Sequence, residues 1–582
     1  MTNPSNILIK YLPILVWTKK YNKGDATGDL SAAIIVTLML VPQALAYAVL
    51  SGLPPQVGLY ASMLPLIAYA IFGTSSTLAV GPVAVASLMT ATAIQPFSAI
   101  DISLGIQAAV ILACISGFIL VLAGLFRLGF LANFLSHPVI TGFISAASIV
   151  IATSQLSTLL GYSVGGDTVI ELVRTIYDNI DKTDSVTLTL SIITLLFLIV
   201  NKKYGGTLWI NIGLSKFWAQ TAVRIAPAFL VLLGTLAIKA DIPWLDSVRT
   251  VGDITGGLPS LSMPNTDLSL WQALWLPAVL ITIIGYVESI SVAQSLALKR
   301  KERIDPDQEL IALGMSNLAA GFTAALPVSG GVSRSVVNMD AGAVTPAAGL
   351  ITAFGMIIAS VFIANWLGDL PRFILATIII VAVMSLFDAG VFKRTWQYSY
   401  HDFMALIITF SMTLLVNVQS GITAGVLLSI GLHLYRSSRP HTAIVGHVPG
   451  TEHFRNIDRH EVEVCPDVIT IRVDESLYFA NARFLEQRIL EVLAENKMTK
   501  HLILMCCAVN DIDGSALEVL ETVNEQLKTL GVGFHLSEVK GPIMDKLNKS
   551  HFIELLNGKV HLTQFKAYEE LSCFNTYSQP NN

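Results

Sequence analysis

Two short stretches of this chain interrupt apolar runs with glycine and proline, and the second of them carries an arginine. Residues 78–85 read LAVGPVAV, and residues 326–335 read LPVSGGVSRS, in which the arginine is Arg334. Irregular backbone inside a lipid bilayer is tolerated only where protein or a water-filled cavity satisfies its N–H and C=O groups. Paired interruptions in corresponding halves of a membrane protein mark a binding site near the midplane. The spacing therefore predicts two discontinuous helices that form one site.

The two half-helices and Arg334 have the chemistry of an anion site. A helix N-terminus presents free N–H donors and about half a positive charge, and a guanidinium adds a permanent charge with a bidentate fork. The summed charge of roughly +2 suits a divalent oxyanion. Glu288 lies at mid-depth in another apolar segment, and it would neutralise part of this charge, so a monovalent anion also fits. The alternative is that Glu288 and Arg334 only pair with each other to stabilise the core.

Glu288 also offers a way to couple anion movement to protons. A dianion that enters a cell with a negative interior works against about 2.3 kcal/mol per charge at 100 mV. Its uptake therefore requires a cation that travels with it or another anion that leaves. A carboxylate in a partly desolvated pocket can bind and release a proton, so we expect Glu288 to be the proton carrier.

The segments that position these residues are long and apolar. Of the 582 residues, 53% are hydrophobic and only 13% are charged. A spanning helix needs roughly 20 apolar residues, and about fourteen segments fit that template. These spans are approximately residues 29–50, 54–72, 82–95, 105–126, 138–160, 184–200, 217–239, 271–298, 306–326, 334–345, 347–367, 372–390, 402–417 and 421–435.

The charges between the spans predict their orientation. Lysine and arginine gather in every second connection, which the positive-inside rule assigns to the cytoplasm together with the N-terminus. No cleavable signal peptide is recognisable at the start. The long loop 240–270 is then an outer loop with seven spans before it and seven after it, which predicts an inverted repeat. The two breaks fall in the third span of each set, so they are equivalent by this internal symmetry.

The chain is expected to have three parts. Residues 1–28 form a cytoplasmic N-terminal segment, residues 29–437 form the transmembrane domain, and residues 438–582 form a small cytoplasmic α/β domain. The last assignment rests on short β-type runs that alternate with amphipathic helices after Arg439.

The predicted elements of that last part follow from periodicity. Residues 468–473 and 502–509 are expected to be buried strands, and residues 482–495 and 515–530 are expected to be helices.

Several runs in the membrane part carry a family resemblance. They are PQALAYA at 42–48, GLPPQVGLY at 52–60, FGTS at 72–75, AVGPVA at 79–84, GMSNLAAG at 314–321 and VSRSVVN at 332–338. The chain resembles the sulfate permease (SulP) family in these runs. Members of that family have a seven-plus-seven inverted repeat divided into core and gate domains, form homodimers and move anions by alternating access, so the resemblance implies the same here.

The resemblance also implies site residues. The residues expected to line the anion site are Gln43, Tyr47, Val80, Gly81, Val83, Ser333 and Arg334. For Gln43 and Tyr47, helix packing is the alternative role. Glu288 matches the carboxylate proposed for proton coupling in sulfate-transporting relatives, which favours protons over sodium.

The tail carries a second resemblance. The runs LYFANA at 477–482, DIDGSA at 511–516 and VKGP at 539–542 resemble the STAS domain that sulfate transporters share with anti-sigma-factor antagonists. Ser515 occupies the position that is phosphorylated in the bacterial antagonists. The alternative is that its hydroxyl caps the N-terminus of the predicted helix.

The sequence as a whole predicts a secondary active transporter of inorganic anions in the cell (inner) membrane rather than an enzyme. Proton-coupled sulfate uptake is the leading interpretation, with bicarbonate or a C4-dicarboxylate as rival substrates and with sodium coupling or exchange as rival mechanisms. The competing class is an anion sensor that signals through its STAS domain to a cytoplasmic partner protein. We expect no cofactor, no bound metal and no nucleic-acid partner, because no motif for any of them is present.

Overall fold

Long apolar helices dominate the first four hundred or so residues, as the composition requires. In the computed structural model, which describes residues 11–130, 137–162, 166, 168–252, 254 and 256–572, nine helical segments are long and apolar enough to cross a membrane. Two shorter apolar helices, Arg372–Val383 and Tyr400–Leu415, accompany them. Residues 1–10 of the expected N-terminal segment and residues 573–582 of the expected α/β domain lie outside the described residues.

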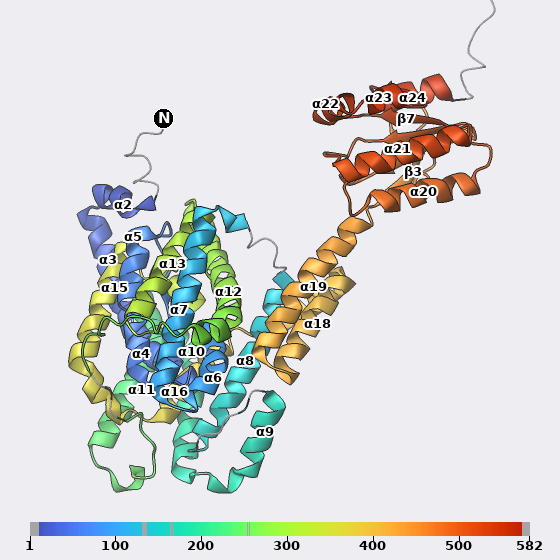
Figure 1. Ribbon diagram of the computed structural model, residues 1–582. Coiled ribbons are helices and arrows are strands. Elements are labelled where there is room, and N and C mark those ends of the chain that lie inside the picture. The colour runs from blue at the N-terminus through green and yellow to red at the C-terminus, as the bar shows by residue number, and fades with distance from the viewer. Residues whose placement is uncertain are drawn as a thin grey trace, which may run out of the picture. The chain divides into compact units, whose positions relative to one another are not determined.

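The chain divides into two units, Met1–Ser429 and Ile430–Asn582 (Figure 1). The helices of the membrane unit are α2 (Ile14–Lys20), α3 (Lys23–Leu50), α4 (Pro55–Tyr60), α5 (Leu64–Phe72), α6 (Ala84–Ser98), α7 (Ile102–Leu125), α8 (His137–Leu159), α9 (Val169–Asp178), α10 (Ser185–Asn211), α11 (Lys216–Lys239), α12 (Leu268–Arg300), α13 (Pro306–Phe322), α14 (Val332–Asp340), α15 (Ala347–Ile358), α16 (Arg372–Val383), α17 (Ala389–Tyr398), α18 (Tyr400–Leu415) and α19 (Val418–Ser438), the last of which continues into the second unit.

Two short strands precede the two broken helices. Strand β1 (Val80–Gly81) lies directly before α6, and β2 (Ser329–Gly330) lies directly before α14. The membrane segments come in the order α3, α4–α5, β1–α6, α7, α8, α10, α11 and then α12, α13, β2–α14, α15, α16, α18, α19. Each broken helix is the third segment of its set, which is consistent with the predicted inverted repeat.

The membrane helices pack as two groups. In the first group α13 lies against α7 and α5, α12 against α7, and α15 against α3 and α5. In the second group α8 packs on α16 and α18, and α10 packs on α11 and α16. Helix α3 also contacts α11 and α16, so the groups meet along this helix.

Small residues explain the close packing inside the first group. A Cβ atom on Gly117 of α7 would lie 2.8 Å from the carbonyl oxygen of Gly314 in α13, and a Cβ on Gly314 would lie 2.8 Å from the carbonyl oxygen of Gly117. Glycine at these positions lets two backbones approach, which is how helices associate in a membrane.

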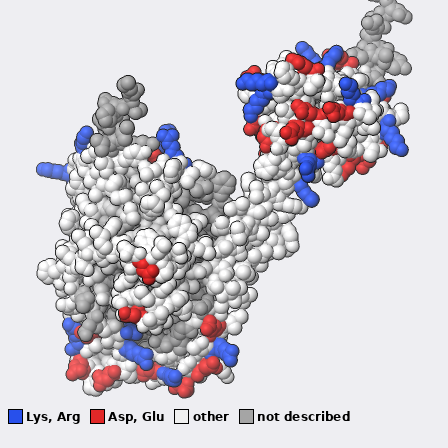
Figure 2. Space-filling view, in the orientation of Figure 1, with Lys and Arg blue, Asp and Glu red and all other residues white. Residues whose placement is uncertain are grey.

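The charged side chains of the membrane unit are distributed as expected for a protein that spans a lipid bilayer. Figure 2 shows the charged side chains of the membrane unit mainly at its two ends, with a largely uncharged band between them. A charge within the hydrocarbon region is expensive, so this band is the surface that faces lipid.

The second unit is an α/β domain. Its sheet has the order β4–β3–β5–β6–β7–β8, with β5 to β8 parallel and β3 antiparallel to both of its neighbours. The strands are β3 (Thr442–His447), β4 (Phe454–Asn456), β5 (Val468–Val473), β6 (His501–Met505), β7 (Gly533–Ser537) and β8 (Val560–His561). The helices are α20 (Ala482–Glu495), α21 (Gly514–Thr529), α22 (Gly541–Lys549), α23 (Phe552–Leu555) and α24 (Gln564–Leu571).

Two apolar clusters cover the two faces of this sheet. One joins alternate strand residues to α20, α21, α22 and α23, and the other joins the remaining strand residues to α24. The predicted strand 468–473 and helix 482–495 match β5 and α20 in both bounds. Strand β6 ends at Met505 rather than Val509, because the chain turns after Met505.

The interpretation of Ser515 as an N-cap is wrong. Asp513 is the N-cap of α21, and its carboxylate accepts a hydrogen bond of 2.8 Å from the backbone N–H of Ala516. Gly514 is the first helical residue, so Ser515 lies inside the first turn, where its side chain is exposed.

Three histidines from neighbouring strands form a ladder on the face that α24 covers. His501 Nδ1 lies 3.2 Å from His535 Nε2, and His535 Nδ1 lies 3.4 Å from His561 Nε2. His561 Nδ1 lies 3.5 Å from a carboxylate oxygen of Glu570 in α24. Burial, with the neighbouring histidines second, lowers the pKa of His535 to about 4. Burial also lowers the pKa values of His501 and His561.

This ladder predicts that acid weakens the α/β domain. An unfolded histidine binds its proton near pH 6.5, whereas His535 in the folded domain binds one only near pH 4. The unfolded state therefore holds more protons in this window, and the unfolding free energy falls as the pH drops through it, by roughly 2 kcal/mol for His535. His535→Gln should remove this part of the pH dependence. Hydrogen exchange in β7 and β8 of the full-length protein, corrected for the intrinsic effect of pH, measures it.

The exposed His453 provides the control. His453→Gln should leave the pH dependence as it is in the wild type. Equal acid sensitivity in the wild type and in His535→Gln would contradict the assignment.

Candidate functional site

The two interrupted segments are joined to each other by backbone pairing. Strands β1 and β2 run antiparallel, with Val80 opposite Gly330 and Gly81 opposite Ser329. The N–H of Gly331 donates to the carbonyl oxygen of Ala79 at 3.0 Å and extends the ladder. The pairing satisfies backbone groups at membrane depth, and it sets the first turns of α6 and α14 beside each other.

The first turns of both half-helices have no side-chain cap. The N-cap residues are Val83 for α6 and Gly331 for α14, and neither has a side chain that can accept a hydrogen bond. Ser87 and Ser335 are the residues whose N–H groups bond back to these two carbonyls. The preceding N–H groups of each first turn are therefore available to an external acceptor.

Arg334 connects the two half-helices. Its side chain is buried, with 2% of its surface exposed, and its Nη1 donates to the carbonyl oxygen of Pro82 at 2.7 Å. Its Nε and Nη2 atoms are also buried and have no hydrogen-bond partner. A buried charge with unused donors is costly unless a ligand pairs with it. This is the strongest indication of a binding site within the described residues.

Arg334 lies on a cavity of about 520 Å³ between the two groups of helices. Six of the residues predicted to take part line this cavity, namely Gln43, Tyr47, Val83, Glu288, Ser333 and Arg334. Val80 and Gly81 do not line it, because they are buried in the β1–β2 ladder behind the guanidinium.

Glu288 lies on the cavity without a fixed partner. Its side chain is half-buried, and no ion pair or hydrogen bond joins it to Arg334 or to another described residue. The two charges are close enough to interact electrostatically, but no direct ion pair of Glu288 with Arg334, the alternative considered from the sequence, is formed.

Two basic residues on this cavity were not predicted to belong to the site. Lys202 of α10 donates to the carbonyl oxygen of Val381 at 3.0 Å, and Arg224 of α11 forms an ion pair of 2.8 Å with Asp340 at the end of α14. Arg224 could have been recognised, because a charge inside an apolar span is a functional signal. Its ion pair links the second group of helices to the first.

Buried hydroxyl and amide groups hold the broken segments in place. Ser335 Oγ accepts the N–H of Ala79 at 2.9 Å, and Ser289 Oγ of α12 accepts the N–H of Gly330 at 2.7 Å. Asn317 of α13 binds both backbone groups of Val328, at 2.9 and 3.0 Å. These contacts fix the register of β1 against β2.

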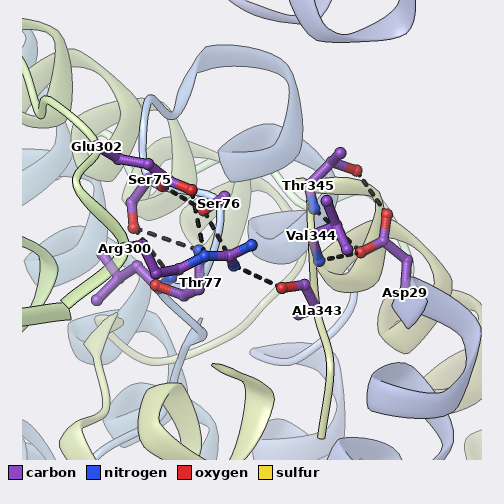
Figure 3. Close-up of polar contacts among 10 residues, drawn as sticks. Asp29, Ser75, Ser76, Thr77, Arg300, Glu302, Ala343, Val344 and Thr345 are labelled. Carbon is purple, nitrogen blue, oxygen red and sulfur yellow. Dashed lines mark hydrogen bonds and ion pairs between the residues drawn. The ribbon is translucent and has the colours of Figure 1, made fainter. Parts of the chain in front are cut away.

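A polar network secures the segment before β1 and the segment after α14 (Figure 3). Arg300 donates to the carbonyl oxygen of Ala343 at 2.5 Å and pairs with Glu302 at 3.2 Å, and Ser76 donates to Glu302 at 2.6 Å. The network therefore joins the end of α12 to both broken segments.

Two fully buried carboxylates complete this framework, and the sequence analysis missed both. Asp29 of α3 accepts hydrogen bonds from the N–H groups of Val344 and Thr345 and from the Thr345 hydroxyl, at 2.6 to 3.0 Å. Glu309 of α13 accepts four, from Tyr69, from Thr74 twice and from Ser75. Each stands among polar neighbours at the start of an apolar run, so no local pattern sets it apart from the acidic residues beside it.

Comparisons with known proteins agree with this architecture. The model of the Sulfate permease family matches residues 27–409, and the STAS domain model matches residues 459–567. The chloroplastic sulfate transporter 4.1 of Arabidopsis thaliana is 34% identical over 557 residues, covering 94% of this chain and 80% of that protein. A probable sulfate transporter of Mycobacterium tuberculosis is 30% identical over 554 residues, covering 95% of this chain and 96% of that protein.

Solved structures show a similar fold. The murine solute carrier 26 family member A9 anion transporter in the inward-facing state has a TM-score of 0.86 at 22% identity, covering 98% of this chain and 95% of that chain. The transmembrane domain of a cyanobacterium bicarbonate transporter, BicA, has a TM-score of 0.59 at 22% identity, covering 70% of this chain and 98% of that chain.

The buried carboxylate of Asp29 yields a test of the framework. Asp29→Asn keeps the shape but turns one accepting oxygen into an amide that faces an N–H donor, which costs about 1–3 kcal/mol. The amides of Val344 and Thr345 should then exchange with solvent about tenfold faster or more. Asp25→Asn, in the half-buried first turn of the same helix, where the carboxylate accepts the N–H of Asn22 at 3.2 Å, is the control and should leave their exchange unchanged. Unaltered exchange in Asp29→Asn would show that this carboxylate does not hold the segment.

Proposed function

This chain belongs to the sulfate permease family, and on that premise we propose that it is a secondary active transporter that takes up sulfate together with protons by alternating access. It is a multi-pass membrane protein with a C-terminal STAS domain, and its curated relatives are transporters rather than enzymes.

The observation that carries the proposal is the buried guanidinium of Arg334 with unpartnered Nε and Nη2 atoms. These two atoms lie on adjacent positions of the guanidinium plane, so they can donate side by side to two oxygens of one oxyanion. The first turns of α6 and α14 supply further N–H donors and a favourable dipole.

The charge around the cavity supports a divalent anion. Lys202 lines the same space as Arg334, and Glu288 carries the only carboxyl group among the described lining residues. Arg224 also lines it, with its charge balanced by Asp340. The names of the two relatives support sulfate in particular. Bicarbonate and C4-dicarboxylates are the rival substrates, and competition against labelled sulfate uptake separates them.

Glu288 is proposed as the proton carrier because it lines the anion cavity and has no fixed partner. Binding of a proton would remove its negative charge while the anion is present. The charge that crosses the membrane with each sulfate would fall accordingly, which lowers the electrical cost of uptake.

The assembly and regulation of the protein are part of the same proposal. From the family resemblance we propose a homodimer in the cell membrane with the STAS domain in the cytoplasm. Ser515 remains the proposed regulatory position, because its exposed hydroxyl in the first turn of α21 would place a phosphate at a helix N-terminus. A cytoplasmic protein that binds the STAS domain would distinguish the phosphorylated from the unphosphorylated form of Ser515.

Arg334→Ala tests the anion site. Removal of a buried charge-assisted contact costs about 2–5 kcal/mol, so sulfate affinity of the purified protein should fall by at least about thirtyfold. Lys393→Ala, which removes an exposed cation of α17, is the control and should bind sulfate as the wild type does. Unchanged affinity in Arg334→Ala would refute the site. A wild type that binds sulfate but never moves it into vesicles would support the sensor class instead.

Glu288→Gln tests the coupling. The amide keeps the size of the protonated carboxyl group but cannot bind or release a proton. Counterflow exchange of sulfate in reconstituted vesicles should continue, whereas accumulation driven by a proton gradient should fail and net uptake should lose its pH dependence. Full proton-driven accumulation in this variant would exclude Glu288 from the mechanism and favour sodium coupling or anion exchange.

A further inference from the structure

A second cavity of about 430 Å³ lies in the membrane unit, and no residue of the proposed anion site lines it. Its walls come from the end of α3, the second half of α6, the end of α8, the start of α16 and the loop that contains Arg249. Hydroxyl and amide side chains are frequent in these walls. They include Ser51, Thr92, Gln95, Ser154, Gln155, Thr158 and Tyr162.

The second cavity lies at the face that the charge pattern predicts to be the outer one. Arg249, which lines it, belongs to the loop 240–270. This loop separates the two sets of seven spans and is on the outer side by the positive-inside rule. We therefore assign the second cavity to the outer face.

The charged groups in this cavity are both cationic. Arg249 and Arg372 line it, and no described lining residue is acidic. The carboxylate of Asp184 lies nearby, where it caps α10 and accepts the hydroxyl of Ser247 at 3.1 Å, but it does not line the cavity. A cleft with one sign of charge concentrates ions of the opposite sign.

The backbone holds the two arginines together. The N–H of Arg372 donates to the carbonyl oxygen of Arg249 at 3.0 Å, and Thr250 pairs with Pro371 in an isolated bridge. The Arg372 side chain also donates through Nε to the carbonyl oxygen of Thr250 at 2.7 Å and through Nη2 to that of Val251 at 3.4 Å, which leaves Nη1 for a ligand. The guanidinium of Arg249 is exposed and has no hydrogen bond or ion pair with a described residue. Arg249 therefore has its donors available.

Only a thin barrier separates this cavity from the site of Arg334. Three helices line both cavities with residues that are only two or three positions apart. Tyr47 of α3, Val85 of α6 and Ile378 of α16 line the cavity of Arg334. Val49, Leu88 and Ala376 of the same helices line the second cavity. Between them lie Ala48, Ser87 and Thr377, all fully buried. The hydroxyl of Ser87 is buried without a hydrogen-bond partner, so this group of the barrier can donate a hydrogen bond to an anion that crosses it.

We propose that the second cavity is an anion-collecting site, in which Arg249 binds the same oxyanion, with the charge of Arg372 beside it, at the predicted outer face before the anion reaches Arg334. This inference rests on the proposed function, because it assumes that an oxyanion is transported. Arg249 then raises the rate and the affinity with which the anion enters from that face, and the Arg334 site itself is unchanged.

Arg249→Gln tests the assignment in vesicles where the orientation of the full-length protein is known from protease access to the STAS domain. For labelled sulfate entering from the predicted outer face, the KM should rise about threefold to tenfold at low salt. The difference should nearly vanish near 1 M salt, where the Debye length is about 3 Å. The KM for movement in the other direction should remain that of the wild type.

Two further variants keep the test decisive. Arg249→Lys keeps the charge and should retain the KM of the wild type. Arg174→Gln removes a cation of α9 that pairs with Asp178 at 3.9 Å and does not line the cavity, and it should change neither KM.

The outcomes separate this inference from the proposed function. If the wild type transports sulfate and Arg249→Gln has an unchanged KM, a KM raised equally in both directions or an effect that salt does not reduce, the collecting site is refuted while the proposed function stands. If the wild type transports no sulfate, the proposed function fails and this inference fails with it.

Discussion

The antiparallel pairing of β1 with β2 is the constraint on which the candidate site depends. These short strands satisfy backbone groups that would otherwise be unpaired at membrane depth, and they hold the uncapped first turns of α6 and α14 beside each other. Arg334 completes the arrangement, because it belongs to one half-helix and donates to the Pro82 carbonyl before the other. Its remaining donors are thereby fixed in direction and left for a ligand, so the site exists before an anion arrives.

Much of this architecture could be predicted from local sequence, because glycine, proline and hydrophobic periodicity report on the backbone close to them. The runs 78–85 and 326–335 predict the two breaks, and the runs in the tail predict β5 and α20 with their bounds. Contacts between residues that are far apart in the sequence could not be predicted in this way. Asp29 binds a segment 315 positions away, and no local pattern identifies such a partner. For the same reason the sequence does not reveal that Val80 and Gly81 face the β-ladder whereas Val83 faces the cavity. Ser515 was misjudged as a cap because the acidic residue two positions earlier competes for that role.

The two cavities are lined by different parts of the same three helices. Both are lined by α3, α6 and α16. The cavity of Arg334 lies at the start of α6, the end of α16 and the middle of α3, and the second cavity lies further along α6, at the start of α16 and at the end of α3. Helix α3 is also where the two groups of helices meet. The glycine contacts between α7 and α13 stiffen the first group, while the ion pair of Arg224 with Asp340 crosses between the groups. A shift of one group against the other would therefore act on the thin barrier between the cavities, which is the geometry that alternating access requires.

The central claim is that Arg334 and the first turns of α6 and α14 hold the transported oxyanion. Selenate has the charge and shape of sulfate and contains an atom with strong anomalous scattering, so diffraction from crystals grown with selenate locates it directly. The account predicts an anomalous peak on the cavity of Arg334, within hydrogen-bond reach of Nη2 and of the first amides of both half-helices. A peak at another position, with the Arg334 guanidinium still unpartnered, would contradict it.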